Sequence, residues 1–331
     1  MTPPLVSAVV VAWNAGAALD TCTNSLRASA RLAHIGLELV IVDNASDDDA
    51  VHALPLGAED VCIRNPTNAG YGVAAAQGMA RATAAWILLV NPDVAVAPEF
   101  FGALVPLTSS VDDTVATLVP ELRYASQDGR INSRGITVDD VGIPAEIDSG
   151  TVVSGEGPSR EVLGGSSGCC LLRASAVHEL GGPEPVFFAY LEDVDLAVRL
   201  QRLGYRALFV PAAVAWHEGS ASAGEGSALK TFLVARNRRL LFRLNGPYTL
   251  RARVWRIPIE VGHALISTSF GTWSAPWLGR IDALRLRRYA SFVRRSRAAH
   301  DAHVAEPPLT PRATLRATLR RKRRVFTTVR R

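Results

Sequence analysis

A single carboxylate, Asp93, stands where an apolar run of the sequence gives way to polar residues. The run is Trp86–Val90, and the chain continues Asn-Pro-Asp. Mg²⁺ and Mn²⁺ prefer oxygen ligands and commonly bind through one or two protein carboxylates together with substrate phosphates. Asp93 is therefore a candidate cation ligand in a protein that handles a diphosphate. The alternative is a solvated turn at the end of a strand.

Two adjacent acids, Glu192 and Asp193, form a second constellation. They follow the aromatic stretch Phe187–Tyr190 in the sequence Tyr-Leu-Glu-Asp-Val-Asp-Leu. A carboxylate beside an apolar wall can have its pKa raised towards a value that is useful for a general base. A simpler explanation is the attraction between acids and the N-terminal end of a helix, and it is sufficient for Asp195.

Polar residues after another apolar run, Leu37–Val42, could contact a nucleotide. The sequence continues Asp-Asn-Ala-Ser-Asp, with Asp43 directly after the run. A carboxylate there can accept hydrogen bonds from a base N–H or a ribose hydroxyl, while Asn44 and Ser46 either fix the turn or touch the ligand. A plain Asx turn is the alternative.

The turn at residues 65–72, Asn-Pro-Thr-Asn-Ala-Gly-Tyr-Gly, contains Asn68 and Gly70 and opens an alanine-rich stretch. Such a turn at a helix N-terminus suits an anion or a nucleotide. It is not the G-x-G-x-x-G fingerprint of dinucleotide-binding proteins, and the sequence Trp-Asn-Ala-Gly, which includes Asn14, follows the first apolar run instead. This disfavours a dehydrogenase.

A lone histidine, His217, follows the sequence Val-Ala-Trp. A lone histidine is more often structural than a ligand. Its neighbour Glu218 and the Gly/Ser-rich segment 219–227 nevertheless favour a functional site.

Apolar runs that alternate with helical spacing predict the element order of the first 120 residues. Strands alternating with helices indicate a parallel sheet with right-handed crossovers, and ligands bind such sheets at the carboxyl ends of the strands. The predicted strands are Leu5–Ala12, Leu37–Val42, Val61–Arg64 and Trp86–Val90, and the predicted helices are Ala17–Leu32 and Tyr71–Thr83.

The pattern changes after this first part. Residues 117–167 show short strands and Gly/Asp/Ser turns, which predicts an excursion at the sheet edge. Regular elements then return, and beyond residue 227 the chain is helical and rich in Arg and Trp. The predicted elements here are the strands Gly168–Arg173 and Tyr205–Val210 and the helices Ala174–Leu180 and Glu192–Leu203.

Composition excludes several classes of protein. The 331 residues are 48% apolar and 20% charged, as in a globular protein. Four cysteines without metal-ligand spacing predict free thiols in a reducing compartment. The N-terminal apolar run has no basic region before it, so a strand is expected rather than a signal peptide. No apolar stretch of 18 residues predicts a membrane span.

Charge is divided between an acidic body and a basic tail. Residues 280–331 contain sixteen Arg and Lys against three acids, while residues 1–279 contain twenty against twenty-eight. Such a tail suits an anionic surface, either phospholipid headgroups or nucleic acid. The acidic body argues against nucleic-acid binding beyond non-specific contact.

The order and spacing of these motifs resemble family 2 glycosyltransferases of the GT-A fold, and in particular their bacterial rhamnosyltransferase-like branch. The resemblance covers roughly residues 5–245. It implies an α/β, Rossmann-like nucleotide-diphospho-sugar transferase domain at 1–245, with a mostly parallel sheet flanked by helices. A helical, membrane-associating extension at 246–300 and a basic, disordered tail at 301–331 are expected to follow. The motifs that carry the resemblance are Trp13-Asn14, Val42 to Asp48, Asn68-Ala-Gly70, Asn91-Pro-Asp93, Glu192 to Leu196 and Trp216-His217.

The resemblance also implies roles for individual residues. Asp193, with Glu192 as the fallback, is expected to be the general base. Asp93 is expected to hold Mg²⁺ or Mn²⁺ against the donor's phosphates, with His217 as a further ligand. Asp43 is expected to contact the nucleobase, with the rest of the nucleotide site formed by Asn14, Asn44, Asn68 and Gly70.

The implied reaction is inverting transfer of a sugar from a nucleotide diphosphate (dTDP-, UDP- or GDP-linked) to a hydroxyl group. Rhamnose is the favoured sugar, and a glycan or a polyprenyl-diphosphate-linked precursor of cell wall or polysaccharide is the expected acceptor. Arg236 and Arg238 could add positive charge near the diphosphate, and a surface position is an equal alternative for both.

The Trp- and Arg-rich segment 247–297 and the tail predict a cytoplasmic protein attached to the inner face of the membrane. Alternatively, the Trp residues pack a helical subdomain and the tail only aids solubility. Two other functions remain open: a catalytically silent nucleotide- or carbohydrate-binding protein, and a sugar nucleotidyltransferase. The latter usually has a Gly-rich basic loop after its first strand, and this chain lacks one.

Overall fold

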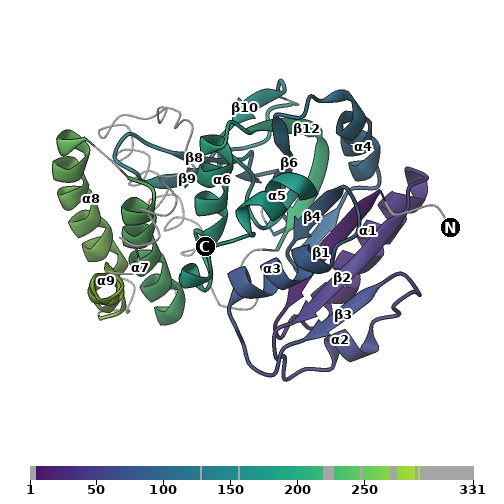
Figure 1. Ribbon diagram of the computed structural model, residues 1–331, viewed down its shortest axis with the longest axis horizontal. Helices are drawn as coiled ribbons and strands as arrows, with labels where there is room; N and C mark the ends of the chain where they lie inside the picture. The colour runs from purple at the N-terminus through teal and green to yellow at the C-terminus, as the bar shows by residue number, and fades with distance from the viewer. Residues whose placement is uncertain are drawn as a thin grey trace.

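The chain folds into one mixed β-sheet with helices on both faces, and three further helices stand beside one end of the sheet (Figure 1). A small separate hairpin accompanies the sheet. The predicted α/β class with a C-terminal helical extension is confirmed. The computed structural model describes residues 5–126, 129–155, 157–218, 227–246, 249–268, 274–287 and 290.

The N-terminal half of the sheet is parallel. β1 (Val6–Ala12) lies between β2 (Leu37–Asp43) and β4 (Trp86–Val90), and β3 (Val61–Arg64) pairs with the outer side of β2. β1 and β4 are buried along their whole length, because helices cover both of their faces. All four predicted strands are confirmed to within one residue.

The other half of the sheet mixes directions. β11 (Cys169–Arg173) runs antiparallel to both β4 and β6, and β6 is parallel to β12. The remaining strands pair antiparallel: β10 with β12, β5 with the end of β12, and β7 with β6. Their bounds are β5 Val94–Val96, β6 Val115–Tyr124, β7 Ile131–Ser133, β10 Arg160–Val162 and β12 Arg206–His217.

The excursion predicted at the sheet edge is wrong in its first part. β6 lies inside the sheet, between β11 and β12, and its first eight residues are buried. The charged residue Glu121 interrupts the apolar pattern that would have predicted a buried strand. In the structure its carboxylate is buried between Arg123 and Arg134, at 2.7 Å from each. The later part is built from short strands as predicted, and it includes the separate hairpin of β8 (Ile136–Val138) and β9 (Pro144–Glu146).

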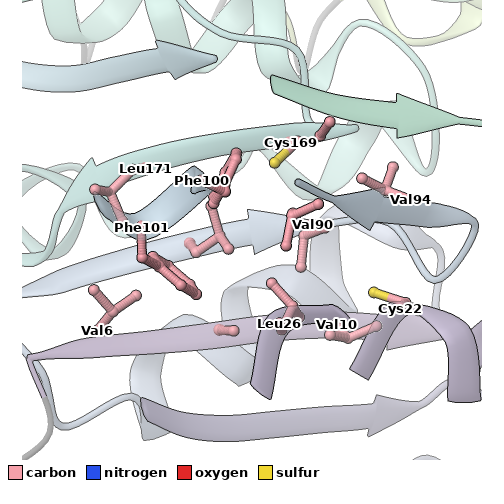
Figure 2. Packing of buried hydrophobic residues seen from close by; sticks show 14 of the residues in the cluster. Val6, Val10, Cys22, Leu26, Val90, Val94, Phe100, Phe101, Cys169 and Leu171 are labelled. Carbon is pink, nitrogen blue, oxygen red and sulfur yellow. The ribbon is translucent and has the colours of Figure 1, made fainter. Parts of the chain in front are cut away.

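Two helices, α1 (Ala18–Leu32) and α4 (Phe100–Ser110), cover one face of the sheet. Leu26 of α1 and the edge-to-face pair of Phe100 and Phe101 pack on the side chains of β1, β4 and β11 (Figure 2). This packing fixes the strands whose carboxyl ends carry Asp43 and Asn91.

The opposite face is covered by α3 (Tyr71–Arg81), α5 (Ala174–Leu180) and α6 (Glu192–Arg202). The predicted helices all form, with ends within two residues of expectation. A short helix, α2 (Ala50–Ala53), packs on the side of α1, and a 3₁₀ turn, η1 (Pro185–Phe187), lies beside α3.

The C-terminal helices are α7 (Ala228–Leu244), α8 (Leu250–Thr268) and α9 (Ala275–Arg285). Leu240, Leu241 and Leu244 of α7 pack in one cluster with Val194 and Ala197 of α6. None of the described helices is long and apolar enough to cross a bilayer. The tail predicted to be disordered, 301–331, lies outside the described residues.

Candidate functional site

The segment Ser167–Gly168, which leads into β11, connects the two acidic constellations. The backbone N–H of Ser167 donates to Asp193 Oδ2 over 3.0 Å. Gly168 accepts a hydrogen bond from the backbone N–H of Asn91 (3.0 Å), and a Cβ on Gly168 would lie 3.8 Å from His217 Cε1. Asp193 and His217 therefore lie at the two ends of one short segment, on the same side of the molecule.

Asp93 and His217 form a close pair where β4 and β12 end. Asp93 Oδ1 is 3.3 Å from His217 Nε2, and the two side chains are only 10% and 15% exposed. The backbone fixes this pairing, because Val94 of β5 is the register partner of His217 and the N–H of Glu218 donates to the Asp93 carbonyl oxygen (3.0 Å).

The environment of the imidazole ring fits a divalent cation. His217 Nδ1 is 3.1 Å from the amide oxygen of Asn132, which can only accept, so Nδ1 carries the hydrogen. Nε2 is buried without a hydrogen bond and faces Asp93. Two electron-rich atoms this close need a proton or a cation between them. Adjacent ligands of one octahedral Mg²⁺, each at about 2.1 Å, lie about 3 Å apart, close to this separation.

No cluster of three or more His, Cys, Asp or Glu residues that could hold a metal occurs among the described residues. A cation held by Asp93 and His217 therefore takes its other ligands from substrate oxygens and water. This composition is usual for Mg²⁺ at a phosphate site.

Glu192 and Asp193 differ in their access to solvent. Glu192 is 4% exposed and its Oε2 has no hydrogen-bond partner, whereas Asp193 is half-buried. Asp193 accepts two backbone hydrogen bonds, from Ser167 (3.0 Å) and Val194 (2.8 Å), which fix its orientation. Asp193 is therefore the acid that a substrate can reach.

Burial and the neighbouring charge separate the roles of the two acids. Burial first, and the charge of Asp193 second, raise the pKa of Glu192 from 4.5 to about 8. Burial also raises the pKa of Asp193, while its backbone hydrogen bonds act in the opposite direction. Glu192 therefore keeps its proton near neutral pH, and Asp193 is the acid of the pair that ionises first.

Folding stability should depend on this pair. The folded Glu192 keeps its proton up to about pH 8 and the unfolded one loses it near 4.5, so the folded state binds more protons between these values. The free energy of unfolding should therefore fall as pH rises through this window. Glu192→Gln should flatten the slope, and Glu59→Gln, at an exposed site, should not. Urea unfolding at about pH 5, 7 and 9 measures how the free energy of unfolding changes with pH. An equal change in the wild type, Glu192→Gln and Glu59→Gln would contradict the raised pKa of Glu192.

A strained segment leads into these acids. Phe188, Tyr190 and Leu191 have φ angles of 63°, 70° and 67°, each of which costs about 1–3 kcal/mol in a non-glycine residue. The buried Asn237 of α7 holds the segment, because its amide donates to the carbonyl oxygens of residues 187, 189 and 190 over 2.7–2.8 Å. The position of Asp193 thus depends on a helix outside the sheet.

Gly70 contacts the same segment from the other side. A Cβ on Gly70 would lie 2.5 Å from the ring of Phe188 and 2.7 Å from its carbonyl oxygen, and its φ is +87°. The backbone N–H of Gly72 also donates to that oxygen (3.2 Å). The turn at residues 65–72 and the segment before Asp193 therefore pack as one unit, at a point where only glycine fits.

Gly70→Ala should consequently lower the free energy of unfolding by about 3 kcal/mol or more, because backbone strain and a clash add together. Gly16→Ala is the matched control, since Gly16 also has a positive φ (+55°) but nothing within 4 Å of its Cβ position. It should cost about 1–2 kcal/mol. Denaturant unfolding compares the two, and equal losses would show that the contact with Phe188 carries no weight.

The amide of Asn44 fastens the turn at residues 65–72 to the end of β2. Its oxygen accepts from Asn65 Nδ2 (3.0 Å) and from the backbone N–H of Ala69 (3.1 Å), and its nitrogen donates to Asn68 Oδ1 (2.9 Å). Of the two roles open to Asn44, the structure thus shows the turn-fixing one. Contacts of Asn68 and Gly70 with a nucleotide stay a prediction.

Asp43 and Asn14 lie in two loops that are bonded together. Asp43 Oδ1 accepts the backbone N–H of Ser46 (2.9 Å), as in the Asx-type turn considered above. Asn14 Oδ1 accepts the N–H of Asp47 (2.7 Å), and the N–H of Asn14 donates to Ser46 Oγ (3.1 Å). Both residues thus stand at carboxyl ends of neighbouring parallel strands, and their contact with a nucleotide stays a prediction.

Comparison with known proteins identifies the family of this chain. A family model described as "Glycosyltransferase like family 2" matches residues 3–240. The chain belongs to this family. The match includes every predicted site residue of this family 2 chain, and it ends within α7.

One curated relative of this family 2 chain is the N-acetylglucosaminyl-diphospho-decaprenol L-rhamnosyltransferase of Mycobacterium tuberculosis, which two strains represent with the same match. The identity is 42% over 72 residues, or 22% of this chain. The match spans about a quarter of the relative's length (24%).

Solved structures of glycosyltransferases share the GT-A fold with this family 2 chain. GalNAc-T7 with UDP, GalNAc and Mn²⁺ has a TM-score of 0.57 and 16% identity over 73% of this chain and 48% of that one. The mannosyltransferase PcManGT from Pyrobaculum calidifontis, with GDP-Man and Mn²⁺, has a TM-score of 0.53 and 15% identity, over 91% and 86%. TarS 1–349 of S. aureus has a TM-score of 0.51 and 13% identity, over 89% and 90%.

Two arginines of this family 2 chain, Arg236 and Arg238, make contacts within the protein, and their role near a diphosphate stays a prediction. Arg236 donates to the carbonyl oxygens of Val186 (3.0 Å) and Phe187 (2.7 Å). Arg238 is buried against Glu260, at 3.1 Å. Neither is a surface residue, and both serve packing of the C-terminal helices.

Three residues of the site, Ser167, Asn132 and Asn237, were not predicted from the sequence. Each acts through a contact between residues far apart in the chain, at separations of 26, 85 and about 50 positions. A serine or an asparagine carries no local signal of such a role.

Proposed function

We propose that the protein is an inverting, metal-dependent glycosyltransferase that uses Asp193 as its general base. The carrying observation is the arrangement around Ser167–Gly168, which joins the base candidate to the Asp93–His217 pair. A sugar transferase needs both parts together, one to activate the acceptor and one to stabilise the leaving diphosphate.

In the proposed reaction, Asp193 accepts the proton of the acceptor hydroxyl. The acceptor oxygen attacks the anomeric carbon from the face opposite the diphosphate, and the bond from that carbon to the diphosphate oxygen breaks. The nucleoside diphosphate leaves with the electron pair, so the anomeric configuration inverts. A protonated Glu192 beside the base keeps the buried pair at a single negative charge.

Asp93 and His217 are proposed to hold Mg²⁺ or Mn²⁺, with Asn132 orienting the imidazole ring. A divalent ion there supplies positive charge that offsets the charge developing on the leaving diphosphate. Asp43, Asn14, Asn68 and Gly70 are proposed to line the nucleotide site.

The donor sugar and the acceptor follow from the curated relative by analogy. Its printed name gives L-rhamnose as the sugar and N-acetylglucosaminyl-diphospho-decaprenol as the acceptor. We therefore propose a dTDP-linked deoxysugar such as rhamnose as the first donor to test, ahead of UDP- and GDP-linked sugars, and a polyprenyl-diphosphate-linked glycan as the acceptor. This acceptor would place the work of the protein at the cytoplasmic face of a membrane, in cell-wall or polysaccharide synthesis.

Donor turnover decides between catalysis and silent binding. Purified protein is incubated with dTDP-, UDP- and GDP-sugars, with Mn²⁺, Mg²⁺ or EDTA, and release of the nucleoside diphosphate is measured with and without a polyprenyl-diphosphate-linked acceptor. Thermal shift shows independently which nucleotide binds, because a ligand of the folded state raises the melting temperature. Binding without any turnover would support a silent protein, and pyrophosphate release from a nucleoside triphosphate a nucleotidyltransferase.

A further inference from the structure

Helix α8 exposes a stripe of apolar side chains and buries a cluster of charged ones. Leu250, Val254, Ile257, Val261 and Leu265 are between 42% and 76% exposed. Their spacing of three or four residues places them on one side of the helix. A helix of a water-soluble protein normally turns such a stripe inwards, so the exposed stripe needs a reason.

The inner side of α8 holds a cluster of ions beside the buried apolar residues Ala252, Ile259 and Ala264. Glu260 is buried among Arg238, Arg256 and Arg280, with contacts of 3.1, 3.2 and 2.8 Å. Burial alone would raise the pKa of Glu260, but the three arginines lower it to about 2. The ion cluster therefore locks α8 to α7 and α9 in one orientation, and the apolar stripe cannot rotate inwards without breaking it.

Helix α9 repeats this arrangement. Arg280, Gly279 and Ala283 face the neighbouring helices, and a Cβ on Gly279 would lie 2.2 Å from the carbonyl oxygen of Phe232 in α7. The outer side carries exposed apolar residues at helical spacing, each 41–52% exposed: Trp277, Leu278, Ile281 and Leu284. Both helices lie at the end of the molecule farthest from β1, β2 and β3 (Figure 1).

The positive charge on the outer sides of α8 and α9 indicates an anionic partner. The exposed charged residues that the structure describes on α8 and α9 are arginines, Arg253 and Arg285. The two acids of these helices point elsewhere, since Glu260 is in the ion cluster and Asp282 lies 3.9 Å from Arg236. Apolar and aromatic side chains interspersed with arginine match the boundary between acyl chains and anionic headgroups.

We propose that the outer sides of α8 and α9 insert into the interface of a bilayer that contains anionic lipids. This inference does not depend on the sugar-transfer reaction. A second copy of the chain fits less well, because a symmetric contact would bring arginines against arginines. The net basic sequence of residues 280–331, sixteen cations against three acids, adds attraction to the same surface.

Vesicle co-sedimentation of the full chain tests the surface, with phosphatidylcholine vesicles that contain or lack phosphatidylglycerol. The wild type should bind the anionic vesicles more tightly. The variant Val254→Ser/Ile257→Ser/Val261→Ser should bind at least about tenfold more weakly, because it removes apolar surface that insertion would transfer out of water. Leu32→Ser/Val152→Ser is the matched control, since both residues are similarly exposed (56% and 62%) but lie outside these helices. It should bind like the wild type.

Tryptophan fluorescence gives an independent measurement of depth. Trp255 and Trp277 are 42% and 41% exposed, so brominated acyl chains should quench the wild type and quench Trp255→Phe/Trp277→Phe much less. Circular dichroism and nucleotide thermal shift confirm that the variants are folded. Unchanged vesicle binding by the triple serine variant would assign attachment to the tail and overturn the proposal. The proposal would also be overturned if the wild type bound no vesicles but formed a dimer in sedimentation velocity, and the triple serine variant did not. The surface would then be a protein interface.

Discussion

Asp193→Asn should reduce kcat about 10²–10⁴-fold, the range that general-base catalysis covers. The amide keeps the size of the side chain and can still accept the Ser167 hydrogen bond through its oxygen, but it cannot take a proton from the acceptor. Binding of the donor nucleotide should be nearly unchanged, because the fall is expected in kcat rather than in the affinity. Steady-state transfer and nucleotide thermal shift measure the two effects separately.

Glu192→Gln and Asp113→Asn are the controls for this result. Glutamine resembles the protonated form that Glu192 holds near neutral pH, so kcat there should stay within about tenfold of the wild type. Asp113 has a fully exposed carboxylate and should have no effect. If Glu192→Gln abolishes transfer and Asp193→Asn does not, the base is Glu192 and the assignment argued from solvent access is wrong.

The fold was largely predictable because its strands and helices are marked by local patterns. β1, β2 and β4 are continuous apolar runs that end abruptly at polar residues, and such runs mark strands buried on both faces. β6 was misplaced because it buries Glu121, and no local pattern shows that Arg134, thirteen residues further on, joins Arg123 of the same strand in pairing with this glutamate. The antiparallel direction of β11 likewise depends on a connection that has no sequence signature.

The candidate site was predictable in its ingredients and not in its geometry. Asp43 and Asp93 could be predicted at the same edge of the sheet, because each follows a parallel strand and parallel strands end at one edge. The choice between Glu192 and Asp193 stayed open in the sequence, since adjacent residues differ in solvent access only through their packing. The strained backbone at residues 188–191 could not be predicted, because the amide of Asn237 that holds it lies about 50 positions further along the chain.

Asp93→Ala should lower kcat by about two orders of magnitude or more, because it removes the one carboxylate in the Asn-Pro-Asp motif and leaves the leaving diphosphate without its counter-charge. The same variant should lose the increase in melting temperature that Mn²⁺ adds to a bound nucleoside diphosphate, and should keep the increase that the nucleotide gives alone. Thermal shift with nucleotide, Mn²⁺ and EDTA measures this separation.

Asp93→Ala removes both a negative charge near the phosphates and a proposed metal ligand, and a control must separate these two effects. Glu218→Gln is the matched control, because Glu218 is exposed and its backbone N–H donates to the carbonyl oxygen of Asp93. It removes one negative charge beside the site and should leave the Mn²⁺ effect intact. Asn132→Ala should lie between the two, since it frees the imidazole ring to reorient without removing a ligand. This order, Asp93→Ala largest, then Asn132→Ala, then Glu218→Gln, follows from coordination. A Mn²⁺ effect equally reduced by Glu218→Gln and Asp93→Ala would instead indicate long-range electrostatics, and Asp93 would then have no place as a ligand.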